Sequence, residues 1–167
     1  MTATLGQAEV FAAAGIEDIF LANLITAPSK IARLCSLARR VKMTVAVDSD
    51  ANARDLGEAA ADAGVTLNVV VDINTRLEGT GVAPGRPAVE LANVVAAEEG
   101  LHFAGLMTYE GAILAEDAEL VSESNKWIQQ VLDTREKVEK AGLDVEIVSV
   151  GGTHNYEIAG DIDGVTE

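Results

Sequence analysis

The sequence predicts an α/β fold that forms part of a (β/α)8 barrel. Five apolar runs of strand length alternate with segments of helical spacing, which is the pattern of parallel strands joined by helical crossovers. A glycine-rich loop follows the last of these strands, whereas an open nucleotide-binding sheet carries such a loop after an early strand. Barrels commonly bind phosphate after their seventh and eighth strands. The position of the loop therefore favours a partial barrel over an open sheet.

Glycine marks the end of four expected helices, each time directly before an apolar residue that leads into the next strand. A glycine at this position adopts the left-handed conformation that ends a helix and turns the chain back towards the sheet. The four are Gly15, Gly64, Gly100 and Gly142. Their intervals are unequal, so they indicate an alternating architecture and not a sequence repeat.

The first half of the chain reads as three helices that alternate with three strands. Thr4 and Gln7 have the spacing of a capping box, in which each side chain satisfies a backbone N–H of the other residue. Asp50 is placed to cap the third helix, which is rich in alanine. In order, the sequence predicts a helix through Ala8–Ala14, a strand Ile16–Leu21, a helix from Pro28 to Arg40, a strand Met43–Val47, a helix Ala51–Ala63 and a strand Leu67–Ile73.

The second half continues the alternation with longer helices. A helix follows Pro84–Pro87 and runs to Glu98, and a strand Phe103–Thr108 comes next. A long amphipathic helix then ends at Gly142, and the strand Val145–Val150 passes directly into Gly151-Gly152-Thr153. The apolar stripe expected on the long helix consists of Leu120, Trp127, Val131, Leu132 and Val138.

Polar residues occur where the expected strands end, at the edge that carries the ligand in both barrels and open α/β sheets. They are Asn23, Asp48 with Ser49, Asn74, Tyr109 and the run Ser149–Thr153. Glycines let a backbone approach an anion, so the loop Gly151–Thr153 can offer N–H groups and a hydroxyl to phosphate. An ordinary turn has the same sequence pattern, and Asp48 and Asp50 are equally well explained as helix caps.

The composition indicates which classes of protein and which partners can be excluded. The chain has 167 residues, a formal charge of −15 and 49% hydrophobic residues, which is enough for one core. The acidity argues against nucleic acid and anionic membranes as partners. Cys35 is the only cysteine, and His102 and His154 are isolated, so we expect no disulfide and no metal pair. No signal peptide or membrane span is recognisable, and we expect a cytoplasmic protein.

An ordered set of motifs resembles the D-threonine aldolase and D-serine dehydratase-like family, whose members are pyridoxal-phosphate enzymes built on the alanine-racemase type of barrel. The resemblance covers essentially the whole chain. It rests on Ala3–Val10, Ala13–Ile19, Lys30–Leu34, Val45–Ser49, Gly105–Gly111, Gly151–Thr153 and Gly164–Glu167. It implies that residues 1–167 form a single partial barrel domain of about strands 3 to 7, without the family's N-terminal lysine strand and C-terminal β-domain.

The resemblance also implies a cofactor site. Gly151, Gly152 and Thr153 match the family's phosphate-binding loop, and Tyr109 matches a tyrosine that lies beside the cofactor. The family's arginine for the pyridine ring is replaced by Gly79, and Arg76 is the candidate substitute. The implied cofactor is pyridoxal 5′-phosphate, with a divalent metal in the intact enzyme whose ligands are not in this chain. We assign no catalytic residue.

The activity implied is that of a lyase for β-hydroxy-D-amino acids, by retro-aldol cleavage to glycine and an aldehyde. Dehydration or racemisation by the same barrel family, an unrelated phosphate-binding barrel enzyme, and a non-catalytic α/β module for a phosphorylated small molecule are the alternatives. The lysines read as surface residues, so we expect an inactive fragment. An unclosed barrel also exposes two edge strands, so we expect low independent stability. The sequence leaves a homo-oligomer open. The lysines are Lys30, Lys42, Lys126, Lys137 and Lys140.

Overall fold

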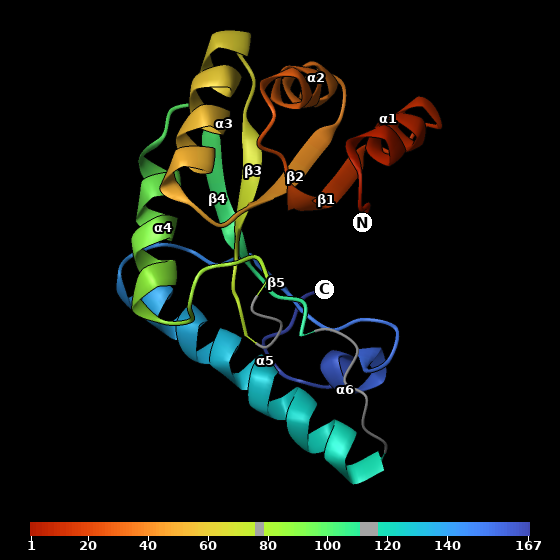
Figure 1. Cartoon of the computed structure of the whole chain (residues 1–167), viewed down its shortest axis with the longest axis vertical. Helices are drawn as coiled ribbons and strands as arrows, with labels where there is room; N and C mark the ends of the chain where they lie inside the picture. Colours follow the sequence, from red (N-terminus) through yellow and green to blue (C-terminus); the bar gives the residue numbers. More distant parts are fainter. Residues whose placement is uncertain (76–78, 111–116) are drawn as a thin grey trace. The chain divides into compact units, whose positions relative to one another are not determined.

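The computed structural model describes residues 1–75, 79–110 and 117–167, with side chains from residue 118 in the last range (Figure 1). Helices and strands alternate along the whole chain. The elements are α1 (Leu5–Ala13), β1 (Asp18–Leu24), α2 (Pro28–Ala38), β2 (Lys42–Val47), α3 (Asp50–Ala63), β3 (Leu67–Asp72), α4 (Arg86–Ala97), β4 (Leu101–Met107), α5 (Asp117–Lys140), β5 (Ile147–Ser149) and α6 (Tyr156–Gly160).

The five strands form one sheet in the order β1-β2-β3-β4-β5. The pairs β1–β2 and β4–β5 are parallel. A doubly wound sheet reverses its strand order near the middle, whereas a barrel adds each new strand beside the previous one. The observed order is that of a barrel segment, and the predicted fold class is confirmed.

The glycines predicted to end four helices adopt the expected left-handed conformation at all four positions. Gly15, Gly64, Gly100 and Gly142 have φ angles of 90°, 64°, 84° and 92°, a conformation that costs glycine little because it has no Cβ. The cap of α3 differs from the prediction. Ser49 and not Asp50 is the N-cap, because Ser49 has extended backbone angles and its side chain accepts a hydrogen bond from the Asn52 N–H.

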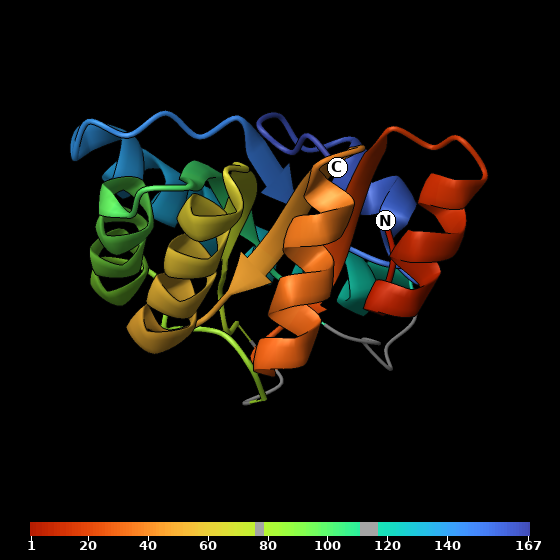
Figure 2. The ribbon, with the colours of Figure 1, turned by 90° about the horizontal axis from the view of Figure 1, so that it is seen from above.

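The chain divides into two compact units, and the first consists of Met1–Val70 with Asn93–Ala104. Helices α2 and α3 pack side by side in this unit (Figure 2). The turn at Gly100 lies against α3, where a Cβ on Gly100 would come within 2.6 Å of the Ala61 backbone nitrogen. The Leu67 N–H donates to the Gly100 carbonyl, so this contact fixes where β3 begins.

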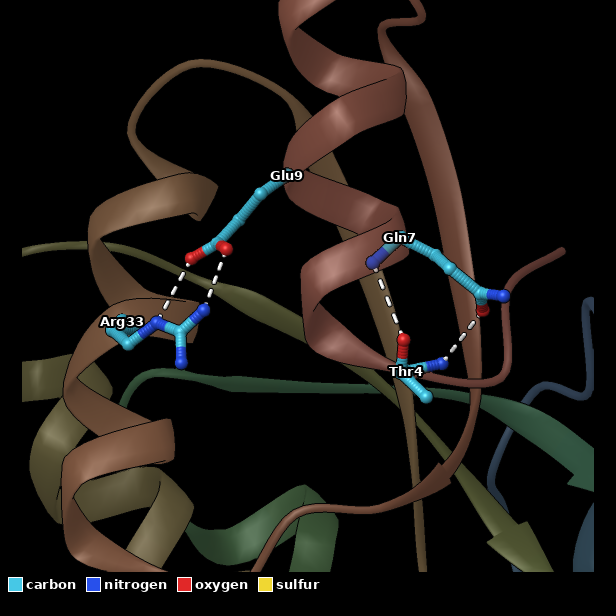
Figure 3. A network of polar contacts seen from close by, with 4 residues as sticks. All are labelled: Thr4, Gln7, Glu9 and Arg33. Carbon is cyan, nitrogen blue, oxygen red and sulfur yellow. Dashed lines mark hydrogen bonds and ion pairs between the residues drawn. The ribbon is translucent and has the colours of Figure 1, made fainter.

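Two polar contacts of the first unit hold α1 in place (Figure 3). The predicted capping box is present: the Gln7 N–H donates to the Thr4 hydroxyl, and the Thr4 N–H donates to the Gln7 amide oxygen. The Arg33 guanidinium on α2 donates two hydrogen bonds to the Glu9 carboxylate, at 3.0 and 2.6 Å. These bonds hold the pKa of Glu9 below its ordinary value and raise the pKa of Arg33.

The second unit consists of Val71–Ala92 with Gly105–Glu167. Its long helix α5 buries a stripe that differs from the prediction. Val131 and Val138 are buried as expected, but Leu120, Trp127 and Leu132 are only partly covered. The remaining buried positions of α5 are Ser124, Ile128 and Thr134. Two of these three are polar, which is why an apolar pattern alone did not find the stripe.

Strand β5 leaves no room for a side chain at Gly105 of β4. This glycine pairs with Ile147 across the two strands, and a Cβ added to it would overlap the Ile147 carbonyl oxygen. A glycine inside a strand often marks such a close backbone approach. The contact brings the carboxyl ends of β4 and β5 together, and both strands lead into the site described below.

In the three described ranges, no helix combines the length and hydrophobicity needed to cross a bilayer.

We expect Glu9→Gln to lower the thermal midpoint slightly at neutral pH. Because the folded-state pKa of Glu9 is lowered, the stabilisation is present above the ordinary pKa of 4.5 and is lost as the pH falls through the lower folded-state pKa. Thermal unfolding of the wild type and the variant at several pH values tests this, with Glu17→Gln as an exposed control. A difference that persists unchanged at strongly acidic pH would contradict the assignment.

We expect Gly105→Ala to be severely destabilising, because the new methyl group would overlap the backbone of β5. Two alanine substitutions separate this steric effect from backbone strain. Gly142→Ala, at a positive φ with open space around it, should cost about 1 kcal/mol. Gly6→Ala in α1 has open space and no positive φ, so it should be neutral or stabilising. Denaturant unfolding measures the loss of unfolding free energy in each of the three variants. Equal losses at positions 105 and 142 would contradict the prediction.

Candidate functional site

The loop that follows β5 is the centre of the candidate site. Gly151 has a φ of 80°, and on one side its α-carbon faces the methyl group of Ala159, which a Cβ on Gly151 would approach to 3.0 Å. The chain then passes through Gly152 and Thr153 into the short helix α6. Both the positive φ and the close approach require glycine at position 151.

A buried polar network lies under this loop. Glu110 is fully buried, as is Ser124 on α5, and Asn155 is 3% exposed. The Gly151 N–H donates to Glu110 Oε2 at 3.1 Å, and the Gly152 N–H donates to Asn155 Oδ1 at 2.9 Å. The Asn155 amide group donates to Glu110 Oε1 and to the Ser124 hydroxyl. Residues from three segments of the second unit, after β4, on α5 and before α6, therefore converge on the loop.

Tyr109 covers the outer side of the loop. A Cβ on Gly152 would come within 2.8 Å of Tyr109 Cε2, so the aromatic ring lies directly against the glycine. Tyr109 is also 51% exposed, although it is one of the larger hydrophobic residues of the chain. An exposed aromatic surface held beside a glycine loop is the kind of surface that a planar ligand can contact.

The sequence predicts that the N–H groups of the loop Gly151–Thr153 are offered to a ligand, and the structure differs from this prediction at two of them. The N–H groups of Gly151 and Gly152 already donate to Glu110 and Asn155. Thr153, by contrast, is exposed, and within the described part of the chain its hydroxyl and its N–H have no hydrogen-bond partner. An anion at this loop would therefore meet the donors of Thr153 first.

Two threonines join the ends of β3 and β4 in the same unit. The Thr108 hydroxyl donates to the Ile73 carbonyl at 2.7 Å, and the Thr75 and Thr108 hydroxyl oxygens are 3.0 Å apart. Because Thr108 has a single O–H, Thr75 must be the donor of the second bond. The chain returns at Val82, whose N–H donates to the Asp72 carbonyl, and this bond closes the loop after β3.

The structure brings together most of the predicted site residues. Tyr109, Gly151, Gly152 and Thr153 are neighbours at the ends of β4 and β5. Arg76 lies outside the described residues, so its role stays a prediction. Asn23 and Asp48 belong to the first compact unit, where the Asn23 side chain donates to the Ala3 carbonyl.

Sequence reasoning missed the network that supports the loop. Glu110 belongs to the family-like motif Gly105–Gly111, but the sequence suggested no role for it. Ser124 interrupts the apolar pattern of α5, and Asn155 follows the loop by two residues. A buried polar stripe on α5 is the signal that could have pointed to them.

The lysines and histidines are exposed side chains. All five lysines are exposed and lie on helices or at the start of a strand. Lys126, which is near Ser124 in sequence, pairs with Glu123 at 3.4 Å and lies over the Trp127 ring. His102 and His154 are also exposed. Within residues 1–75, 79–110 and 117–167, no group of three His, Cys, Asp or Glu side chains could hold a metal ion.

A separate hollow of about 700 Å³ lies between α2 and α3 in the first unit. Cys35 lines it, and burial raises the pKa of this thiol. The other lining residues are Pro28, Ile31, Ala32, Ser36, Arg39, Asp55, Glu58, Ala59, Asp62 and Ala63. These residues come from helix faces and not from strand ends, so the hollow is not the site expected of a parallel α/β protein.

Comparisons with known proteins agree with this fold. The family described as the N-terminal domain of alanine racemase matches residues 1–165. A 3-hydroxy-D-aspartate aldolase of Paracoccus denitrificans (strain Pd 1222) is 35% identical over 155 residues, which are 91% of this chain and 40% of that protein.

Two solved structures extend the comparison. The D-threonine aldolase from Filomicrobium marinum superposes with a TM-score of 0.92 at 34% identity and covers 95% of this chain and 43% of its own. The D-threo-3-hydroxyaspartate dehydratase from Delftia sp. HT23 superposes with a TM-score of 0.85 at 29% identity. The match covers 99% of this chain and 44% of the dehydratase. The chain thus spans about two-fifths of the length of these relatives.

We expect Gly152→Ala to displace the Tyr109 ring, because the new methyl group would lie 2.8 Å from Cε2. In a Tyr109→Ala background the same substitution should cost little, which gives a coupling energy of at least about 0.5 kcal/mol. A double-mutant cycle of unfolding free energies measures this. Gly160→Ala, which has open space around it, serves as the control and should be additive with Tyr109→Ala. Additivity at position 152 would contradict the packing.

Proposed function

Because the chain belongs to the family of the alanine racemase N-terminal domain, we propose that it forms the phosphate-binding part of a pyridoxal-phosphate lyase for β-hydroxy-D-amino acids. The observation that carries the proposal is the loop Gly151–Thr153, which leaves the carboxyl end of β5 beside the exposed ring of Tyr109. The chain covers only part of its relatives, so the activity is that of a larger protein.

The names of the relatives support the substrate class. An aldolase for 3-hydroxy-D-aspartate, a D-threonine aldolase and a dehydratase for D-threo-3-hydroxyaspartate all act on D-amino acids that carry a hydroxyl group on the β-carbon. We propose retro-aldol cleavage of such a substrate, which yields glycine from D-threonine-like compounds. Dehydration is the second candidate, because the dehydratase matches 98% of the chain at 30% identity.

The residues present fit the phosphate end of the cofactor. Gly152 has no Cβ, so the Tyr109 ring can lie directly against the loop. The Thr153 hydroxyl and N–H are placed to donate to phosphate oxygens, and the exposed face of Tyr109 can contact the cofactor. Arg76, outside the described residues, is proposed to face the pyridine ring. When bound, pyridoxal phosphate supplies the electron sink for the reaction.

This chain's lysines are not proposed to hold the cofactor covalently. Each is exposed, and those of the second unit lie on α5, two of them paired with glutamates. The inactivity of the chain by itself stays a prediction that follows from these positions. A small D-amino acid is the proposed substrate partner, and a homo-oligomer and a cytoplasmic location remain expectations from the sequence.

The proposal predicts reversible, non-covalent binding of pyridoxal phosphate to this chain. Thr153→Ala should weaken binding about tenfold, because a hydrogen bond to a charged phosphate is lost. Thr66→Ala, at an exposed position of the other unit, is the control and should have no effect. An absorbance titration with inorganic phosphate as competitor measures both variants.

Borohydride reduction followed by mass spectrometry completes the test. We expect no stoichiometric adduct on any lysine. A single adduct at one position would show that the chain attaches the cofactor itself, and absence of binding at millimolar pyridoxal phosphate would overturn the proposed function.

A further inference from the structure

We propose that Glu110 and Asn155 are positioning residues that set the conformation of the glycine loop. By accepting the N–H groups of Gly151 and Gly152 from the inner side, they leave the donors of Thr153 on the outer side. The inference rests on the proposed function only in that the loop is taken to receive a phosphate.

The burial of Glu110 is the first argument. A carboxylate with no exposed surface is costly unless it is fully hydrogen-bonded, so a protein retains one only where its contacts compensate for the lost hydration. Both carboxylate oxygens of Glu110 accept hydrogen bonds, one from the Gly151 N–H and one from the Asn155 amide. One of the two partners belongs to the loop itself, and the other holds the loop's next residue.

The direction of the hydrogen bonds is the second argument. A backbone N–H can only donate, so Asn155 must present Oδ1 to Gly152 and its NH₂ group to Glu110. The NH₂ group also donates to the Ser124 hydroxyl on α5. Reversing the amide would place donor against donor at Gly152 and acceptor against acceptor at Glu110. The network therefore has one consistent arrangement, and that arrangement specifies the loop.

The surroundings of the loop are the third argument. Ala159 lies behind Gly151 and Tyr109 lies in front of Gly152, so the loop is confined on two sides. With two N–H groups also fixed, the loop is formed before any ligand arrives, and binding need not pay for ordering it. The role is one of positioning, since Glu110 and Asn155 are buried and contact the loop and not a ligand.

A reciprocal exchange of acid and amide tests the network. Glu110→Gln replaces one acceptor oxygen by a donor group, and Asn155→Asp alone brings two carboxylates into contact. In the double variant E110Q/N155D, the amide at position 110 can accept from the Gly151 N–H and donate to the carboxylate at position 155, which still accepts from the Gly152 N–H. The exchange preserves the net charge and allows the same four pairs of groups to bond, with the amide at position 110 and the Ser124 hydroxyl now donating to the carboxylate at position 155.

Amide hydrogen exchange of Gly151 and Gly152, followed by NMR without cofactor, is the primary readout. We expect E110Q and N155D each to accelerate exchange about tenfold or more, and the double variant to return it to within about threefold of the wild type. The control E119Q/N125D makes the same chemical changes at exposed positions of α5 and should leave exchange unchanged. If E110Q does not fold, recovery of the folded chain in E110Q/N155D is the equivalent result.

Two outcomes would overturn the inference: wild-type protection of both amides in E110Q, or no recovery in the double variant. Pyridoxal phosphate titration of the same proteins is the second readout, with binding expected to follow the exchange rates. If the exchange pattern holds and no protein binds the cofactor, the positioning role stands and the proposed function fails.

Discussion

A buried carboxylate is the constraint on which the site depends. Glu110 has no exposed surface, so its two oxygens must find donors within the protein, and the structure supplies one from the loop and one from Asn155. The arrangement couples the end of β4 to the end of β5 through hydrogen bonds of fixed direction. The loop is thereby held from its inner side by a buried carboxyl group, and the burial is compensated because both oxygens of that group accept hydrogen bonds.

Backbone close approaches bring these groups within reach of one another. Gly105 lets β5 lie directly against β4, and without that contact the loop after β5 could not place an N–H beside Glu110. In the other unit Gly100 performs a similar task where β4 begins against α3. Glycine thus serves three purposes in this chain: it ends helices, it permits close packing, and at Gly151 it shapes the loop.

The sequence was sufficient for the fold because the fold depends on local signals. Alternating apolar segments and glycine C-caps predicted the five strands and all but the last short helix, and the loop after the final strand correctly favoured a barrel. The capping box at Thr4 was also predicted, because its partners are three residues apart. The N-cap of α3 was wrong by one residue, since Ser49 and Asp50 are both good caps and only the backbone angles decide between them.

The site was harder to predict because its interactions are not local. Asn155 contacts Glu110 across 45 positions and Ser124 across 31, and no periodic pattern connects such pairs. The family resemblance identified the loop and Tyr109, but it did not show that the glycine N–H groups are already occupied. Polar residues on the buried face of α5 were visible in the sequence, and an apolar stripe was the wrong pattern to seek there.

A crystal structure of this chain with pyridoxal phosphate would test the account most directly. We expect the phosphate at the loop after β5, with an oxygen within hydrogen-bond distance of the Thr153 hydroxyl or N–H. The Gly151 and Gly152 N–H groups should still donate to Glu110 and Asn155. A phosphate bound to those two N–H groups with Glu110 displaced, or one bound away from the loop, would contradict it.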